Sequence, residues 1–348
     1  MTSMSMLCEM GREMDRETIV SLWRRNLPEA SPGRYPWLYD QGPAQSWILR
    51  DADRKAVGSI GLMARRMRIF GKMETVGQGV DMNVDLRHRS LGPAMTLQRA
   101  ITATVRDGTC RLIYTFPNDK SEAIAQRCGC RQVAEVGRWV LPLKSEKVLA
   151  PWLRQSLLRK SASTAVDAAL WALSPEARYA RPPGIKVYVT DGFDRRFDAL
   201  WAAATSDGIV GQRNAAFLQW RFGRNPDVCH RVLCMDGPDG ALLGYLVYHG
   251  HEGTVFWSDF FAAEPRLLDY LLVEGIRLAR HERAEQLTTI FIGSDRNTRR
   301  LRHFGFHRRP TPWRMWIYVE GDRDGGKGAQ FLDEQSWYLT RADIDTDF

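Results

Sequence analysis

The sequence predicts an α/β (α+β) chain built from two similar domains in tandem. The first observation is length, because 348 residues exceed the size, about 250–300 residues, at which a single hydrophobic core usually stops growing. The second is a weak internal repeat, in which each half runs through an amphipathic helix, strands, a long helix and a short strand ending in Phe. We therefore expect domains over residues 1–148 and 185–320, an amphipathic linker over 149–184 and a tail over 321–348.

The expected elements follow the same order in both halves. In the first half, apolar spacing predicts helices and strands over Thr18–Leu27, Ser46–Leu49, Val57–Ile69, Glu74–Leu86 and Pro93–Arg106. In the second half, it predicts them over Phe193–Ala204, His230–Cys234, Leu242–Gly250, Thr254–Phe261 and Pro265–His281. Gly129-Cys130 and Gly305-Phe306 then occupy matching places, each after a helix and before a last strand.

A turn carrying Gly92 stands between the strand that ends at Leu86 and the helix that begins at Pro93. Backbone N–H groups in such a turn lack internal partners and point at one place, where the helix dipole adds about half a positive charge. Gly92 lets the backbone approach closely, and proline suits the first helical position. The predicted phosphate-binding residues are Arg87, Arg89, Ser90, Leu91, Gly92, Pro93 and Ala94.

Arg89, Gly92 and Ala94 fit the pattern Arg or Gln, two residues, Gly, one residue, Gly or Ala. With a strand before it, a helix after it and Asn118 behind the next strand, this stretch resembles the acyl-CoA-binding core of the GCN5-related N-acetyltransferase superfamily. The resemblance covers residues near 15 to 145, and it implies a mixed central sheet flanked by helices in each domain. The alternative is a βαβ unit of another α/β domain, in which Gly92 serves only a tight turn.

The resemblance implies transfer of an acyl group from CoA to an amine, with acyl-CoA as cosubstrate. Backbone N–H groups near Met82, Asn83 and Val84 would then polarise the thioester carbonyl, and Asn118 would line the pantetheine or acceptor side. Our first choice of general base is Asp81, which is equally readable as a salt-bridged strand carboxylate. Ala125 stands where many members carry a tyrosine that protonates the leaving thiolate. Tyr114, on the adjoining strand, is the candidate to take over that role.

The second half departs from the pattern where the chemistry would need it. Residues 262–266 hold neither the glycine nor the preceding basic residue, and Glu264 would face any phosphate there. We expect a single CoA site, in the N-terminal domain, and a degenerate C-terminal domain that shapes an acceptor pocket or supports the fold. Two other readings stay open: a catalytically idle CoA-sensing or interaction protein, and a transferase whose donor is an acyl carrier protein.

The acceptor is least constrained. Phe116-Pro117-Asn118 and the ending Trp337 to Thr340 with Asp343 and Asp345 look similar to bacterial proteins of envelope polysaccharide or lipid synthesis, among them bacterial ceramide synthases. That similarity implies a long-chain amino base or an envelope sugar amine as acceptor. The basic amphipathic linker, which includes Trp152 and Arg154, suits either an anionic membrane surface or packing on a neighbouring domain.

Charge, hydropathy and cysteine spacing limit the partners, the cellular location and the metal sites that we expect. The net charge of +8 fits CoA phosphates, acidic lipid or nucleic acid, but the basic run from Arg296 to Arg309 reads as the solvated face of a helix, which makes nucleic acid an unlikely partner. No run of about 18 apolar residues and no signal segment is present, so we expect a cytoplasmic protein, peripheral at the inner face of the membrane if the acceptor is lipidic. Cys128-Gly129-Cys130 has no second pair, and we expect no metal site.

Overall fold

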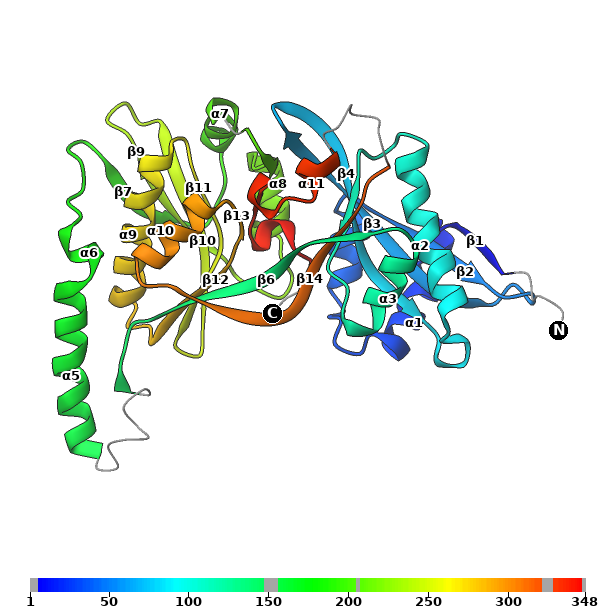
Figure 1. The fold of residues 1–348 in the computed structure, drawn as a ribbon, viewed down its shortest axis with the longest axis horizontal. Coiled ribbons are helices and arrows are strands. Elements are labelled where there is room, and N and C mark those ends of the chain that lie inside the picture. Colours follow the sequence, from blue (N-terminus) through cyan, green and yellow to red (C-terminus); the bar gives the residue numbers. More distant parts are fainter. Residues whose placement is uncertain (1–5, 147–155, 205–206, 321–327, 346–348) are drawn as a thin grey trace.

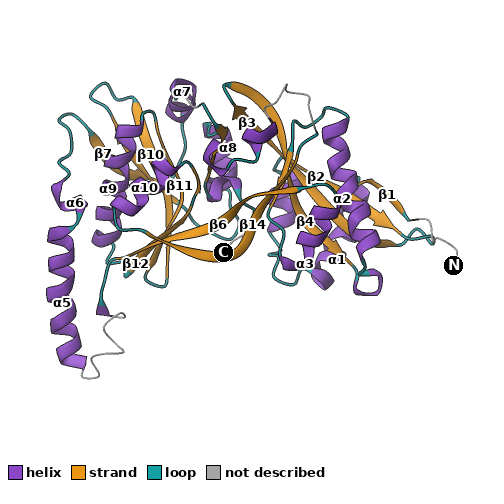
Figure 2. Cartoon of the chain, viewed as in Figure 1, coloured by secondary structure: helices purple, strands orange, loops and turns teal. Residues whose placement is uncertain are grey.

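The computed structural model describes residues 6–146, 156–204, 207–320 and 328–345. In these residues fifteen strands form one continuous mixed sheet with helices packed on it (Figures 1 and 2). The sheet runs the length of the molecule, with the first half of the chain at one end and the second half at the other. The predicted mixed α/β fold is therefore confirmed.

The first half follows the predicted order closely. Its elements are β1 (Leu7–Met10), α1 (Arg16–Asn26), β2 (Ala44–Arg50), β3 (Ala56–Ile69), β4 (Lys72–Val84), α2 (Leu91–Arg106), β5 (Ile113–Thr115), α3 (Asp119–Arg127) and β6 (Arg131–Pro142). Helix α2 turns Leu97, Ile101 and Val105 into the core at the 3.6-residue spacing that predicted it. A short π-helical turn, Pro36–Asp40, lies between α1 and β2.

The second half repeats this order. Its elements are α5 (Ser156–Leu173), α6 (Pro175–Arg178), β7 (Lys186–Thr190), α7 (Arg195–Ala203), β8 (Ile209–Gly211), α8 (Ala215–Leu218), β9 (Arg231–Asp236), β10 (Leu242–His251), β11 (Thr254–Ala262), α9 (Pro265–His281), β12 (Gln286–Ile290), β13 (Ile292–Gly293), α10 (Asp295–His303), β14 (His307–Tyr318), α11 (Gly328–Phe331) and β15 (Trp337–Leu339). A second π-helical turn, Gln219–Gly223, matches the first.

The two π-helical turns meet as a symmetric pair. The Trp37 and Trp220 rings stack with centroids 5.2 Å apart. Each indole donates to the backbone oxygen of the other residue, at 2.9 Å from Trp37 and 3.0 Å from Trp220. Both tryptophans are buried, so equivalent turns of the two halves hold each other through equivalent contacts.

The last strands of the two halves are exchanged. Strand β14 of the second half pairs with β5 of the first, at Trp316 opposite Thr115, while β6 pairs with β12, at Leu141 opposite Leu287. Strands β6 and β14 also pair with each other and cross the middle of the molecule side by side (Figure 1). The sheet consequently passes from one half into the other without a break.

The C-terminal segment adds a second connection. Strand β15 pairs with β8 and β13, and β8 pairs with β3 of the first half. Between these two connections lies a shared apolar core that takes residues from both halves, including Met67, Tyr114, Ile209, Met315 and Trp337. Residues 340–345 therefore lie next to first-half strands.

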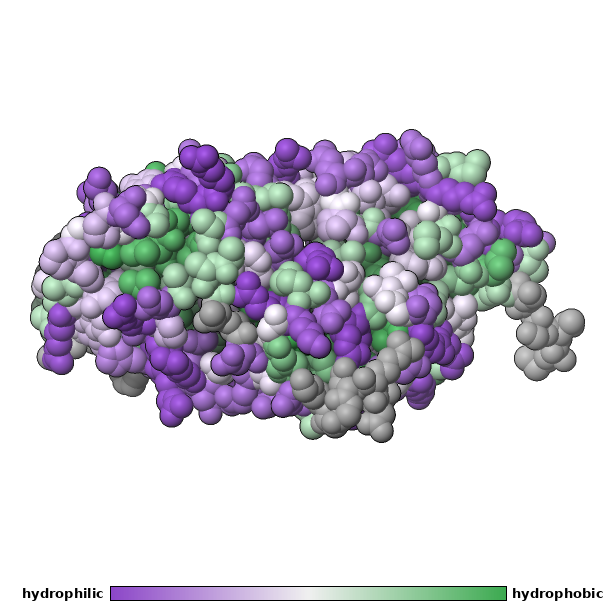
Figure 3. All heavy atoms as spheres, turned by 90° about the horizontal axis from the view of Figure 1, so that it is seen from above, coloured by the Kyte–Doolittle hydropathy of each residue, from purple (hydrophilic) through white to green (hydrophobic). Residues whose placement is uncertain are grey.

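The predicted linker is partly described. Trp152 and Arg154 lie outside the described residues, and α5 extends from the body of the molecule at the end that holds the second half (Figure 2). Two of its side chains, Val166 and Trp171, are 37% and 51% exposed. Among the residues that the structure describes, no helix has the length and apolar character needed to cross a membrane. The face seen from above is mostly hydrophilic, with smaller apolar patches (Figure 3).

Candidate active site

Strands β4 and β5 pair over only part of β4. The parallel pairing runs from Gly77 opposite Ile113 to Gly79 opposite Thr115, after which β5 ends and β4 continues to Val84. Just beyond this point the register of β4 against β3 shifts, and Asp81 adopts a left-handed backbone conformation with φ of 52°. The bulge turns β4 away from β5, so the edge of β4 from Val80 onward is not paired with β5.

A cavity of about 720 Å³ opens where the two strands part. One wall is the unpaired edge of β4, and the opposite wall is the start of α3 and the segment before it. The second half of the chain contributes Asp227, Trp313 and Asp345. The lining includes Arg34, Gly79, Val80, Asp81, Met82, Gln98, Thr115, Phe116, Pro117, Asn118, Ser121 and Ala125. The cavity is therefore built by both halves.

One end of the cavity holds two carboxylates around one guanidinium. Arg34 Nε donates to Asp81 Oδ1 at 2.9 Å, and its Nη2 lies 3.3 Å from Asp345 Oδ2. The Tyr39 hydroxyl donates to Asp81 Oδ2 at 3.0 Å, and Gln78 Nε2 donates to Asp345 Oδ1 at 3.1 Å. All three charged side chains are at most 14% exposed, so the cluster is shielded from solvent.

This shielding changes the acidity of the cluster. Burial raises the pKa of Asp345 to about 6; the charge of Asp81 adds to the rise, and Arg34 opposes it. Burial disfavours the charged form of Arg34, but Asp81 and Asp345 outweigh it and raise the pKa of the guanidinium. Arg34 thus stays positively charged, while Asp345 changes protonation state near neutral pH.

The predicted phosphate-binding loop follows directly after β4. Arg87 N donates to Asp85 Oδ1, a short 3-10 turn spans Leu86–His88, and α2 begins at Leu91. The Ser90 side chain makes no capping hydrogen bond, so it does not occupy the N–H groups of the first turn of α2. A Cβ added at Gly92 would meet no atom within 4 Å, which leaves open space over the start of the helix.

The three β4 residues that were predicted to lie in the site, Met82, Asn83 and Val84, have different surroundings. Met82 lines the cavity. Asn83 is buried, where its Nδ2 donates to Ser59 Oγ at 2.8 Å, and Val84 packs in the core beneath α2. Asn118 lines the cavity and caps α3, because its Oδ1 accepts from the Ser121 N at 3.2 Å. Any role of Asn83 or Val84 in the site would belong to the backbone.

Tyr114 is fully buried in the shared core and is not part of the cavity lining. Its hydroxyl has two acceptors within hydrogen-bond distance, Gln78 Oε1 at 3.0 Å and the Asp343 backbone oxygen at 3.1 Å. Burial raises the pKa of this phenol well above its usual range. Tyr114 is therefore connected to the cavity through Gln78, whose amide nitrogen contacts Asp345, and through its ring contact with Phe116.

The sequence analysis did not place Arg34, Asp227, Trp313 or Asp345 in the site. In the sequence Asp345 is only part of the C-terminal resemblance, and Arg34, Asp227 and Trp313 belong to no local motif. Their common feature is distance along the chain: Arg34 and Asp345 contact each other across 311 residues. Secondary-structure propensities and motifs depend on residues that are close in sequence, so they cannot predict such a contact.

The second half carries a smaller cavity, of about 340 Å³, at the start of α9 and α10. Glu264 lines it and pairs with Arg266 at 2.7 Å, and Arg296 and Arg300 line the same cavity. In α10 and just after it, Leu301, Phe304 and Phe306 are buried, which confirms that this basic run covers an apolar helix face.

Burial raises the pKa of Cys130 to about 12, so this thiol stays protonated at neutral pH. Within the described ranges, no group of three or more His, Cys, Asp or Glu side chains is arranged to hold a metal ion.

No family model and no curated protein matches this chain. Solved structures do. A probable N-acyltransferase from Enterococcus faecalis V583 matches with 12% identity and a TM-score of 0.66 over 91% of this chain and 73% of its own. A GCN5-related N-acetyltransferase from Kribbella flavida matches with 12% identity and a TM-score of 0.61, over 91% and 71%.

Saccharomyces cerevisiae N-myristoyltransferase, solved with bound myristoyl-CoA, matches with 14% identity and a TM-score of 0.52 over 95% of this chain and 84% of its own. At these identities the likeness shows the fold. The chain has the mixed α/β fold of the GCN5-related N-acetyltransferases, over a length that fits two such units in tandem. The resemblance that the loop motif indicated is confirmed at that level.

Proposed function

We propose that this protein, with the fold of the GCN5-related N-acetyltransferases, transfers an acyl group from an acyl-CoA to a primary amine. The observation that carries the proposal is the cavity between the diverging strands β4 and β5, with the loop of Gly92 directly after β4. A thioester in the cavity and a pyrophosphate at the loop would belong to one extended ligand.

In this proposal Arg87, Arg89 and the first turn of α2 hold the pyrophosphate, because exposed guanidinium and backbone N–H groups there bind anions. Backbone N–H groups of β4 at Met82 and Val84, which alternate with that of Asn83 and face away from β3, polarise the thioester carbonyl and stabilise the oxyanion that forms on it. The amine nitrogen attacks the carbonyl carbon, the C–S bond breaks, and the thiolate of CoA leaves with the electron pair. Asn118 lines the pantetheine or acceptor side.

The finer prediction concerns the substrates. A long-chain amino base and an envelope sugar amine both present a primary amine, and the carboxylates at one end of the cavity would accept hydrogen bonds from that amine. The donor is acyl-CoA or, in the alternative, an acyl carrier protein. The acyl length that binds most tightly separates lipid acylation from transfer of a small group.

Calorimetry tests the donor site. We expect acetyl-CoA or palmitoyl-CoA to bind the wild type, and Gly92→Glu to weaken binding at least about tenfold by placing a carboxylate where the phosphates lie. A Cβ at Gly92 meets no atom within 4 Å and Gly92 is exposed, so the variant should fold normally. Gly192→Glu is the matched control, because Gly192 is also exposed with open space around it. Equal affinity of Gly92→Glu and wild type would refute the placement.

One observation favours a second function, binding of CoA without transfer. Ala125 lines the cavity at the place where the resemblance would put an acidic tyrosine, and Tyr114 does not reach the cavity. Release of free CoA from a bound acyl-CoA in the presence of amines separates the two functions. A pure CoA sensor would bind the thioester and leave it intact.

A further inference from the structure

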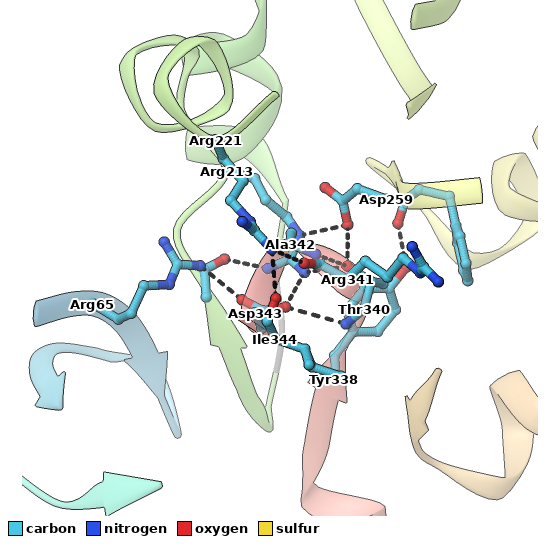
Figure 4. Close-up of polar contacts among 12 residues, drawn as sticks. Arg65, Arg213, Arg221, Asp259, Tyr338, Thr340, Arg341, Ala342, Asp343 and Ile344 are labelled. Carbon is cyan, nitrogen blue, oxygen red and sulfur yellow. Dashed lines mark hydrogen bonds and ion pairs between the residues drawn. The ribbon is translucent and has the colours of Figure 1, made fainter. Parts of the chain in front are cut away.

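The segment Thr340–Asp345 is held by buried arginines from separate parts of the chain (Figure 4). Asp343 accepts from Arg65 Nη2 at 2.7 Å and from Arg213 Nη2 at 2.6 Å. All three side chains are at most 2% exposed. Arg65 belongs to β3 of the first half, whereas Arg213 follows β8 of the second. The carboxylate of Asp343 therefore joins both halves to this segment.

Further contacts fix the segment on its other sides. Thr340 Oγ1 donates to Asp259 Oδ1 at 2.6 Å, and Asp259 lies 3.3 Å from Arg213 Nε. Arg221 Nη2 donates to the Arg341 backbone oxygen at 2.8 Å. Figure 4 shows these side chains converging on the segment from β3, from β11, from the loop after β8 and from the π-helical turn Gln219–Gly223. Such a network leaves the backbone of residues 340–344 little freedom, and Asp345 follows it into the cavity.

Within the cavity, Asp345 differs from Asp81. Both carboxylates accept from Arg34, but the bonds to Asp81 are 2.9 and 3.0 Å, whereas those to Asp345 are 3.1 and 3.3 Å. The groups facing Asp345 include Arg34 from the loop after α1, Gln78 and Asp81 from β4, Tyr114 from β5, and the more distant charge of Arg221. The more loosely held carboxylate is the one whose pKa is raised to about 6.

We propose that the carboxylate of Asp345 accepts the proton of the acceptor amine, and that Asp343, with Arg65 and Arg213, positions it. The inference rests on the proposed function. As the nitrogen–carbon bond forms and the carbon–sulfur bond breaks, the sulfur keeps the electron pair and one Asp345 oxygen takes the proton from nitrogen. Asp81 keeps its ion pair with Arg34, and its charge raises the pKa of Asp345 and so makes Asp345 a stronger base.

The test measures CoA release as a function of pH. Full-length protein, the acyl-CoA that it binds in calorimetry and three probe amines (octylamine, glucosamine and lysine) are followed with a thiol reagent between pH 5 and 9. We expect kcat/KM of the wild type, calculated for the neutral amine, to fall about tenfold per unit below pH about 6, because a protonated Asp345 cannot accept the proton. Asp345→Asn should lose about 10²–10⁴-fold and show no break near pH 6.

Two further variants separate a proton acceptor from a structural residue. Asp81→Asn removes the negative charge that raises the pKa of Asp345, so the break should move to lower pH without vanishing. Asp53→Asn, an exposed turn residue of the same type, should match the wild type. Acyl-CoA affinity of Asp345→Asn within about twofold of the wild type shows that this variant is folded.

The outcomes are distinct. An active wild type whose rate and pH break survive in Asp345→Asn overturns this inference and leaves the proposed function standing. A wild type that binds acyl-CoA but releases no CoA with any probe amine overturns the proposed function, and the inference falls with it.

Discussion

Asp343 links three parts of the chain: β3 through Arg65, the loop after β8 through Arg213, and its own segment Thr340–Asp345. Two arginines donate to it at full burial; burial alone would raise its pKa, but the charges of Arg213 and Arg65 lower it. A buried pair adds little net stability over apolar packing, yet losing one partner strands the other charge. Removing Asp343 should therefore lower the free energy of unfolding by more than the ion pairs contribute relative to apolar packing.

We expect Asp343→Asn to lower the free energy of unfolding by about 3–5 kcal/mol, because Arg65 and Arg213 lose a buried counter-charge. Denaturant unfolding measures the change. The exposed change Asp53→Asn should stay within about 0.5 kcal/mol of the wild type. A loss below about 1 kcal/mol for Asp343→Asn would mean that the network is not formed as described.

Asp345 gives a pH dependence of stability with a definite sign. Its pKa is raised to about 6 in the folded protein, whereas an unfolded Asp has a pKa of about 3.9. The folded state therefore holds the proton more tightly, and the stability that this supplies is present below pH about 4 and lost as pH rises to about 6. Thermal unfolding of the wild type relative to Asp345→Asn should show this fall between pH 4 and 7. A difference that is constant or rises over this range would contradict the raised pKa.

Single elements were the level at which local sequence patterns succeeded. Helix α9 has the predicted bounds, Pro265–His281. Helix α2 begins at Leu91, slightly before the predicted start at Pro93. These elements have long amphipathic stretches and clear start signals, so the local pattern determines them. The loop after β4 also lies where it was predicted, because glycine, proline and the basic residues stand together in one window.

The loop and the start of α2 make an electrostatic prediction. Replacing both Arg87 and Arg89 by Ala should weaken acyl-CoA binding about tenfold at low salt and flatten its dependence on ionic strength, since two exposed phosphate contacts are lost. Calorimetry at several salt concentrations measures both. Arg309→Ala, an exposed arginine of β14, should change neither. An unchanged salt dependence in the double variant would exclude the loop as the phosphate site.

At the scale of the whole molecule, local sequence patterns do not predict how the two halves are joined. Both halves end in an equivalent strand, and nothing in the sequence of β6 or β14 says which half each should join. The structure exchanges them, so β14 completes the sheet beside β5 and β6 completes it beside β12. The same limit hid Asp345, whose place depends on the path of a segment that contacts residues more than 200 positions away.

The exchange makes a prediction about folding. Residues 1–148 alone would leave β5 without β14 and β6 without β12, with the shared core open. We expect this fragment to aggregate or to lack dispersed amide signals in solution NMR, and mixing it with residues 149–348 to restore soluble protein. A folded, monomeric fragment 1–148 would show that the exchange is not needed for the first half.

The measurement that tests the central claim most directly is mass-spectrometric detection of an N-acyl amide after incubation of purified protein with palmitoyl-CoA or acetyl-CoA and the three probe amines. The account predicts amide together with an equal amount of free CoA, and loss of both in Gly92→Glu but not in Gly192→Glu. Bound acyl-CoA that stays intact with every amine would contradict acyl transfer and make the chain a CoA-binding protein.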